Sequence, residues 1–145
     1  MLNIYIDSTI KAPAKREAKG MYLLEYVNDK DPEKFVTRQG FTEYAETTED
    51  AITLTAIIEA LSLLNKPCKI RIFTKARNVF NTLEQRRNET WRQSKWQNSS
   101  QKMVKNCELW ELLTHILERH EWEITTEGHS YENFMESELK KWQRA

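Results

Sequence analysis

Cysteine and histidine are scarce in this sequence, and their scarcity limits the metal chemistry that the chain can support. The two cysteines, Cys68 and Cys107, do not form a C-x-x-C pair, and the three histidines are scattered. Structural zinc sites and disulfide scaffolds both depend on clusters of such residues, so we expect neither. We therefore expect reduced thiols, as in a cytoplasmic protein.

Long hydrophobic runs, low-complexity segments and flexible linkers are also missing. No apolar run approaches the roughly 18 residues that would suggest a membrane span, and nothing near Met1 resembles a signal peptide. With three glycines and three prolines among 145 residues, no break in composition marks a domain boundary. A chain of this length can bury one sizeable core. We expect a soluble, cytoplasmic protein with a single domain over residues 1–145 and no membrane partner.

The charges balance overall but not locally. Lysine plus arginine and aspartate plus glutamate both number 22, which excludes a uniformly basic surface. Between Arg86 and Lys105, however, six basic residues face a single acid, and between Glu108 and Glu138 nine glutamates face a single arginine. The basic stretch could contact nucleic acid. Alternatively, the two stretches are solvated faces of opposite sign.

Hydrophobic periodicity indicates an α/β fold. Alternating or apolar stretches predict strands at residues 3–7, 20–27, 33–44, 69–74 and 122–126. Apolar residues at helical spacing predict helices after Thr47, which we expect as the N-cap, and at residues 76–85, 104–120 and 131–143. The first three strands should form an antiparallel meander, and the fourth should pair parallel to the first because a helix precedes it. The expected architecture is a mixed five-stranded sheet with helices on both faces.

Several motifs follow one another along this pattern. The first strand reads I-Y-I-D-S up to Ser8, Thr47 and Thr48 open a helix rich in Ala, Ile and Leu, and residues 104–110 read V-K-N-C-E-L-W. Trp91 and Trp96 punctuate the basic stretch, and a Gly-His pair at residues 128–129 precedes E-N and E-L pairs. This ordered set resembles type 1 ribonuclease H over nearly the whole chain. The resemblance implies the RNase H-like fold.

The resemblance also implies a degenerate active site. The family uses four carboxylates to hold two divalent ions. Asp7 matches the first, whereas Thr53, Lys75 and Ser137 stand at the other three positions. On this mapping we expect no metal site and no cofactor, with Mg²⁺ or Mn²⁺ needed only if nuclease activity remains. We further expect the Lys75 ammonium to pair with Asp7 where a metal would stand; the alternative is that Lys75 reaches into solvent.

The residues that would grip nucleic acid match the family better. The resemblance implies that Thr48 and Asn106 bind a DNA phosphate, although each could instead cap a helix. Trp91 and Trp96, with Arg87, Arg92 and Lys95, suit a duplex backbone, although the two tryptophans could instead hold this basic protrusion against the body. His129 matches a loop histidine linked to product handling, although without metal ions it could instead be an ordinary loop or surface histidine. Residues 10–16 replace a glycine-rich loop with a basic one, which we expect to contact phosphate through side chains.

Three functions follow from these observations. The first hypothesis is a catalytically inactive ribonuclease H homologue, a pseudoenzyme that binds RNA/DNA hybrid or duplex nucleic acid. The second is a protein-interaction or scaffold module on the same fold, which the acidic stretch from Glu108 to Glu138 favours. The third is a metal-dependent RNA/DNA-hybrid ribonuclease with rewired carboxylates. The sequence names neither the partner nor the oligomeric state.

Overall fold

A five-stranded mixed sheet forms the centre of the molecule. The computed structural model describes residues 1–11 and 14–141. The strands are β1 (Leu2–Ser8), β2 (Arg16–Val27), β3 (Phe35–Thr47), β4 (Lys69–Phe73) and β5 (Glu121–Thr125), and they lie in the order β3-β2-β1-β4-β5. Pairing is antiparallel from β1 to β2 and from β2 to β3, and parallel from β1 to β4 and from β4 to β5. The predicted meander and the predicted parallel pair are both confirmed.

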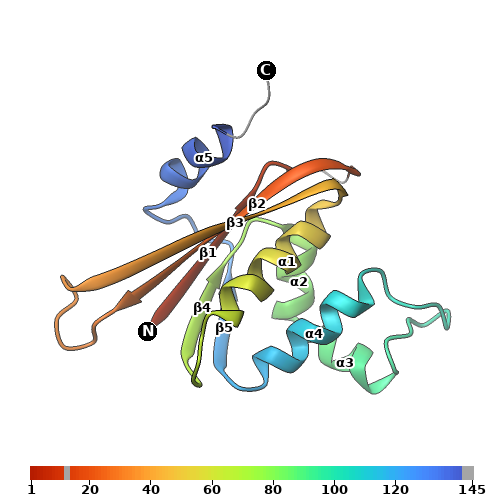
Figure 1. The fold of residues 1–145 in the computed structure, drawn as a ribbon. Coiled ribbons are helices and arrows are strands. Elements are labelled where there is room, and N and C mark those ends of the chain that lie inside the picture. The colour runs from red at the N-terminus through yellow and green to blue at the C-terminus, as the bar shows by residue number, and fades with distance from the viewer. Residues whose placement is uncertain (12–13, 142–145) are drawn as a thin grey trace.

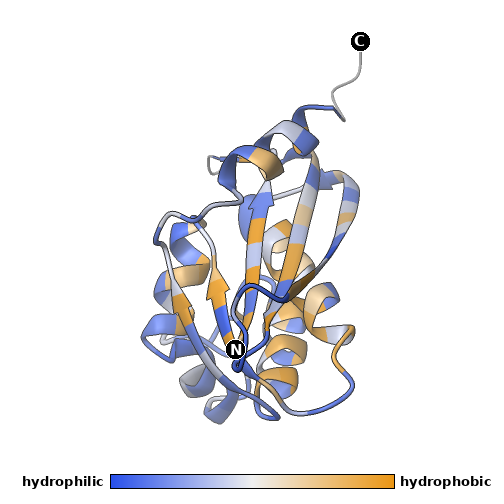
Figure 2. Cartoon of the chain, turned by 90° about the vertical axis from the view of Figure 1, so that its left-hand side faces the viewer, coloured by the Kyte–Doolittle hydropathy of each residue, from blue (hydrophilic) through white to orange (hydrophobic). Residues whose placement is uncertain are grey.

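Helices cover both faces of this sheet, as expected. Figure 1 shows α5 (Glu132–Lys140) on one face, whereas α1 (Glu49–Ser62), α2 (Arg77–Glu84), α3 (Arg87–Gln93) and α4 (Cys107–Leu117) lie on the other. None of the described helices is long and apolar enough to cross a membrane. The alternation of β1 explains the two layers. Ile4 and Ile6 join the large core with α1 and α4, whereas Tyr5 joins the smaller core with Met135 of α5. Figure 2 shows the hydrophobic residues gathered on the central strands and on the helices that pack against them.

The ends of the helices differ from the predicted ones in instructive ways. Thr48, and not Thr47, is the N-cap of α1: its Oγ1 accepts a hydrogen bond of 3.2 Å from the backbone N–H of Ala51. Helix α3 lies inside the basic stretch, where no helix was predicted, because its short polar sequence carries no apolar periodicity. Part of the basic loop (residues 12–13) and the end of the predicted last helix (residues 142–143) lie outside the described residues.

Strands β2 and β3 form a long hairpin that leaves the body of the protein, with β3 at the edge of the sheet (Figure 1). In its register Tyr22 lies opposite Gly40. A Cβ placed on Gly40 would lie 2.2 Å from the hydroxyl oxygen of Tyr22, so the tyrosine ring occupies the space that a side chain would need. Glycine therefore leaves room here for the close approach of the tyrosine ring across the strands.

Candidate active site and nucleic-acid cleft

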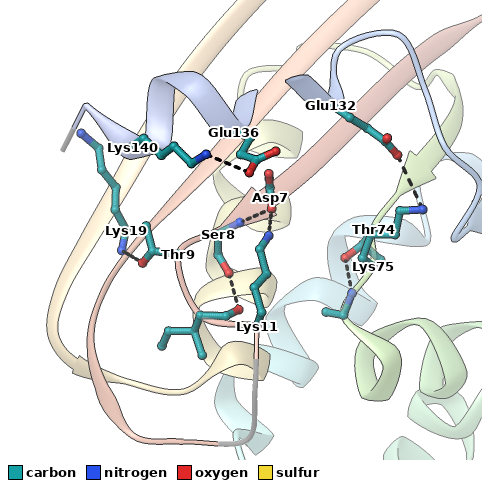
Figure 3. A network of polar contacts seen from close by, with 12 residues as sticks. Asp7, Ser8, Thr9, Lys11, Lys19, Thr74, Lys75, Glu132, Glu136 and Lys140 are labelled. Atoms are coloured by element: carbon teal, nitrogen blue, oxygen red, sulfur yellow. Dashed lines mark hydrogen bonds and ion pairs between the residues drawn. The ribbon is translucent and has the colours of Figure 1, made fainter. Parts of the chain in front are cut away.

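Asp7 and Lys75 lie where β1 and β4 end, at the C-terminal edge of these two central strands. The parallel register sets Tyr5 of β1 opposite Phe73 of β4, and Asp7 and Lys75 each follow two residues later. The carboxylate of Asp7 accepts a hydrogen bond of 2.8 Å from the backbone N–H of Ser8 and forms an ion pair with the ammonium of Lys11 (Figure 3). The predicted Lys75–Asp7 pair is wrong, because the loop after β1 brings Lys11 to Asp7 instead.

Lys75 makes its contacts with the segment after β5 and with α5. Its Nζ donates a hydrogen bond of 2.8 Å to the carbonyl oxygen of Thr126. The same Nζ lies 3.6 Å from Oε1 of Glu132 at the start of α5 (Figure 3). This Glu132 oxygen is buried and accepts no hydrogen bond from the described residues. The Lys75 side chain is still 61% exposed. Both lysines at this strand end therefore keep open access to solvent while they neutralise an acid.

The two other positions of the mapped catalytic set have opposite environments. Thr53 is buried in α1, with 2% of its surface exposed, whereas Ser137 is exposed on α5. Neither side chain carries a charge. At these positions the fold therefore offers hydroxyl groups, one of them inaccessible to solvent.

His129 lies among the charged groups of this edge. Its ring packs 4.3 Å from the ring of Tyr5, centroid to centroid, and its Nδ1 accepts a hydrogen bond of 3.2 Å from the backbone N–H of Tyr131. Burial lowers the pKa of His129, and the Lys75 ammonium lowers it further, whereas the carboxylates of Glu132 and Asp7 oppose the change. The fold thus brings His129 together with Asp7 and Lys75, which the sequence places far apart.

A divalent ion does not fit this edge as it is arranged. Within residues 1–11 and 14–141, no three acidic, histidine or cysteine side chains gather closely enough to hold a metal ion. Divalent cations bind through several oxygen ligands and through charge. Here Asp7 and Glu132 each have an ammonium partner instead.

Glu25 is the centre of a hydrogen-bonded cluster that contacts the residues around His129. This cluster was not predicted from the sequence. Glu25 accepts hydrogen bonds from Asn3 Nδ2 (3.0 Å), Tyr5 Oη (3.1 Å) and Tyr131 Oη (2.5 Å). Burial alone would raise the pKa of Glu25, but these three donors outweigh it, and the pKa is lowered. Burial and the Glu25 carboxylate together raise the pKa of Tyr131 to about 12. Strand alternation could have placed Asn3, Tyr5 and Glu25 on one face, but nothing local points to Tyr131.

A cleft of about 890 Å³ brings together the residues predicted to bind phosphate. Thr48 and Asn106 both line it, and so do Arg87, Trp91 and Lys105. Thr48 also caps α1, whereas Asn106 adopts a left-handed conformation (φ 60°) and makes no side-chain capping bond. The Asn106 amide is therefore not committed to capping α4.

Acidic residues also line this cleft. Glu49 and Asp50 occupy the first turn of α1, where burial raises the pKa of each carboxyl. The nearby ammonium groups of Lys11 and Lys105 counteract this for Glu49 and Asp50, respectively. The cleft is thus mixed in charge, with lysines beside each acid.

The basic protrusion is attached to the body by its aromatic residues. Trp96 is 7% exposed and belongs to the large core, and the ring of Trp91 packs edge-on against Trp110 with centroids 5.9 Å apart. This is the alternative in which the tryptophans hold the protrusion. Arg92 forms an ion pair with Glu118, while Lys95 is exposed. Arg87 is the predicted basic residue that faces the cleft.

With this geometry in hand, comparison with known proteins identifies the family. The RNase H family model matches residues 1–136. The chain belongs to the RNase H family. A ribonuclease H of Clostridium botulinum is 33% identical over 130 residues, which cover 88% of this chain and 83% of that protein. A ribonuclease H of Caldicellulosiruptor saccharolyticus is 34% identical over 93 residues, which cover 63% of each chain.

Solved structures agree on the fold of this RNase H family member. LC9-RNase H1, described as a type 1 RNase H with the type 2 active-site motif, superposes with a TM-score of 0.73 over 98% of this chain and 73% of that chain, at 18% identity. The foamy viral protease-reverse transcriptase in complex with RNA/DNA hybrid gives a TM-score of 0.71 over 97% of this chain and 19% of that chain, at 16% identity. At these identities the likeness establishes the RNase H-like fold alone.

These relatives correct the first functional hypothesis. We expected a catalytically inactive binding protein, because the mapped positions hold Thr53, Lys75 and Ser137. The related proteins that cover most of the chain are instead ribonuclease H enzymes. A pseudoenzyme is not supported, and of the functions weighed from the sequence, the hybrid ribonuclease is the one that the comparisons favour.

Proposed function

We propose that this chain is a ribonuclease H, an endonuclease that cuts the RNA strand of an RNA/DNA hybrid. The observation that carries the proposal is the 33% identity to a ribonuclease H over 88% of the chain. A structural neighbour, LC11-RNase H1, was solved in complex with an RNA/DNA hybrid, which supports the same class of substrate here. We propose that residues 1–145 act as one domain.

The cleft supports the binding half of this function. Thr48 and Asn106 present a hydroxyl and an amide, which are suitable donors for a phosphate oxygen. Arg87 and Lys105 add positive charge in the same cleft. We assign these four residues to the backbone of the bound hybrid, so they position the substrate without reading its sequence.

The strand end supports the chemical half. Asp7 is a carboxylate at this strand end, and its charge acts on the pKa of His129, which supports a joint role for the two side chains. Because Nδ1 of His129 accepts a hydrogen bond from Tyr131, the neutral ring carries its proton on Nε2 and can donate from that atom. We assign Asp7 and His129 to the reaction at the RNA phosphate.

A cleavage assay tests the function directly. An end-labelled RNA/DNA hybrid is incubated with the protein in Mg²⁺, in Mn²⁺ and in EDTA, with single-stranded RNA and duplex DNA as parallel substrates. We expect internal cuts in the RNA strand of the hybrid alone. Asp7→Asn should abolish them, whereas Asp29→Asn, a matched change at an exposed residue of the hairpin, should not.

Two outcomes would contradict the proposal. One is a hybrid that stays intact under every metal condition. The other is a set of cuts that persists unchanged in the Asp7→Asn protein, because that pattern points to a contaminating host nuclease.

A further inference from the structure

The residues at this strand end do not suit a metal ion, but two lysines there supply positive charge. Asp7 pairs with Lys11, and Lys75 lies beside Glu132, at the edge where the described residues form no metal cluster. We propose that Lys11 and Lys75 form a phosphate-binding site at this edge, which grips the substrate backbone without a divalent ion. This inference rests on the proposed function, because it concerns the same nucleic-acid substrate.

The exposure of the two ammonium groups supports a ligand site. Both side chains are 61% exposed, although each contacts an acid. An ammonium has three N–H donors. The hydrogen bond from Lys75 to Thr126 uses one of them, and the 3.6 Å separation from Glu132 is long for another. Donors thus remain for a phosphate oxygen.

The position of Lys11 connects this edge to the cleft. Lys11 pairs with Asp7 on β1, and its charge also opposes the rise in the pKa of Glu49, which lines the cleft. Lys11 therefore lies near both sites. Lys15 and Lys105 line the cleft itself. Together these cations form a track on which one nucleic-acid strand can lie, from the cleft to the end of β1 and β4.

The same lysines disfavour a divalent ion. A cation site gains its affinity from uncompensated carboxylates, and an ammonium beside each acid removes that charge while adding repulsion. A phosphate can still accept hydrogen bonds from these ammonium groups, because both of them remain exposed beside their carboxylate partners. The lysines thus weaken a metal site at this edge and leave N–H donors for a phosphate oxygen.

Binding to a non-cleavable substrate tests this inference separately from cleavage. A fluorescent hybrid whose RNA strand carries 2′-O-methyl groups is titrated with protein, and Kd is measured by anisotropy in EDTA and in Mg²⁺. We expect wild-type Kd values that agree within about twofold in the two conditions. The Lys11→Met/Lys75→Met protein should bind roughly tenfold more weakly, and each lost contact should reduce the salt slope by about 0.9.

Lys34→Met is the matched control. Lys34 is an exposed lysine that pairs with Asp31 in the hairpin turn, so this substitution removes one positive charge away from the site, against two in the double variant. Thermal unfolding verifies that each variant is folded. Wild-type binding that weakens tenfold or more in EDTA overturns the inference, and so does a double variant that binds like Lys34→Met.

A direct metal titration gives a second readout. Calorimetry with Mn²⁺ alone should detect tighter binding to the Lys11→Met/Lys75→Met protein than to the wild type, because two carboxylates lose their partners. Tighter binding to the wild type would overturn the inference. A protein that binds the hybrid without metal but never cuts it would refute the proposed function and leave this inference standing.

Discussion

The carboxylate of Glu25 accepts a hydrogen bond of 2.5 Å from the hydroxyl of Tyr131, which lies 106 residues further along the chain. The same carboxylate holds the hydroxyl of Tyr5, whose ring packs on His129. Tyr131 also donates its backbone N–H to His129. Glu25 thus fastens the sheet to the loop that carries the histidine and to the start of α5.

Glu25→Gln should destabilise the fold. A neutral glutamine has one acceptor oxygen and no negative charge, so it cannot accept all three hydrogen bonds as the carboxylate does. Because the site is only half-buried, we expect a loss of about 1–2 kcal/mol in the free energy of unfolding. Urea denaturation measures it, with Glu121→Gln as an exposed control. Equal stability of the two variants would contradict the role of the cluster.

The Glu25 cluster should also weaken in acid. The pKa of Glu25 is lower in the folded protein than in the unfolded chain, so its ionised form contributes stability above the unfolded value of about 4.3. That contribution is lost as the pH falls through the folded pKa. The stability difference between wild type and Glu25→Gln should therefore shrink below about pH 4. A difference that stays constant from pH 7 to pH 3 would count against this assignment.

His129 should respond in opposite directions to its two charged neighbours. Asp7→Asn removes a charge that raises the pKa of His129, so that pKa should fall further. Lys75→Met removes a charge that lowers it, so the pKa should rise. NMR titration of the imidazole measures both shifts. Shifts in the same direction would show that these groups do not face the ring as described.

Burial of His129 also sets a pH dependence of stability. Its folded pKa lies below the unfolded value of about 6.5, so the unfolded chain takes up the proton first. The stabilisation is complete above that value and declines as the pH falls from about 6.5 through the folded pKa. His129→Gln should flatten the stability curve of the wild type over this window, as measured by urea unfolding at a series of pH values.

Trp96→Ala should cost about 3–5 kcal/mol of folding free energy, because it empties a buried position of the large core. Met103→Ala, at the neighbouring and 57% exposed position, should cost far less. Chemical denaturation compares the two. A small loss of folding free energy in Trp96→Ala would contradict a core role and favour the alternative in which Trp96 stacks on nucleic acid.

Asn106→Gly should separate binding from stability. Glycine adopts the left-handed conformation of this residue without strain, so we expect a stability change within about 0.5 kcal/mol. Loss of the amide should nevertheless weaken hybrid binding several-fold, by anisotropy with the non-cleavable hybrid. Unchanged affinity would remove Asn106 from the phosphate site.

Periodicity predicted the sheet because it is a local property of each strand. The alternation of Ile4 and Ile6 with Tyr5 identifies β1 and its two faces. The helix before β4 predicts its parallel pairing. The helix start was misplaced by one residue, because Thr47 and Thr48 are equally good caps in sequence and only the backbone geometry distinguishes them.

The polar contacts of the site could not be predicted in the same way. A motif identifies the residue at each position, but it does not show which other side chains contact that residue in the folded protein. Lys11 reaches Asp7 because of the loop conformation after β1, and Glu132 reaches Lys75 because α5 starts beside β4. For the same reason, three uncharged or basic residues at the mapped positions led to an expectation of inactivity that the family relationship corrected.

Gly40 and Tyr22 carry a consequence for how this protein can change in evolution. The tyrosine ring fills the space above the glycine across the hairpin, so neither residue can be exchanged alone without a clash or a gap. A larger residue at position 40 needs the ring at position 22 to turn away or to be replaced by a smaller side chain. Among descendants of this sequence, the two positions should therefore vary as a pair and record the order of their substitutions.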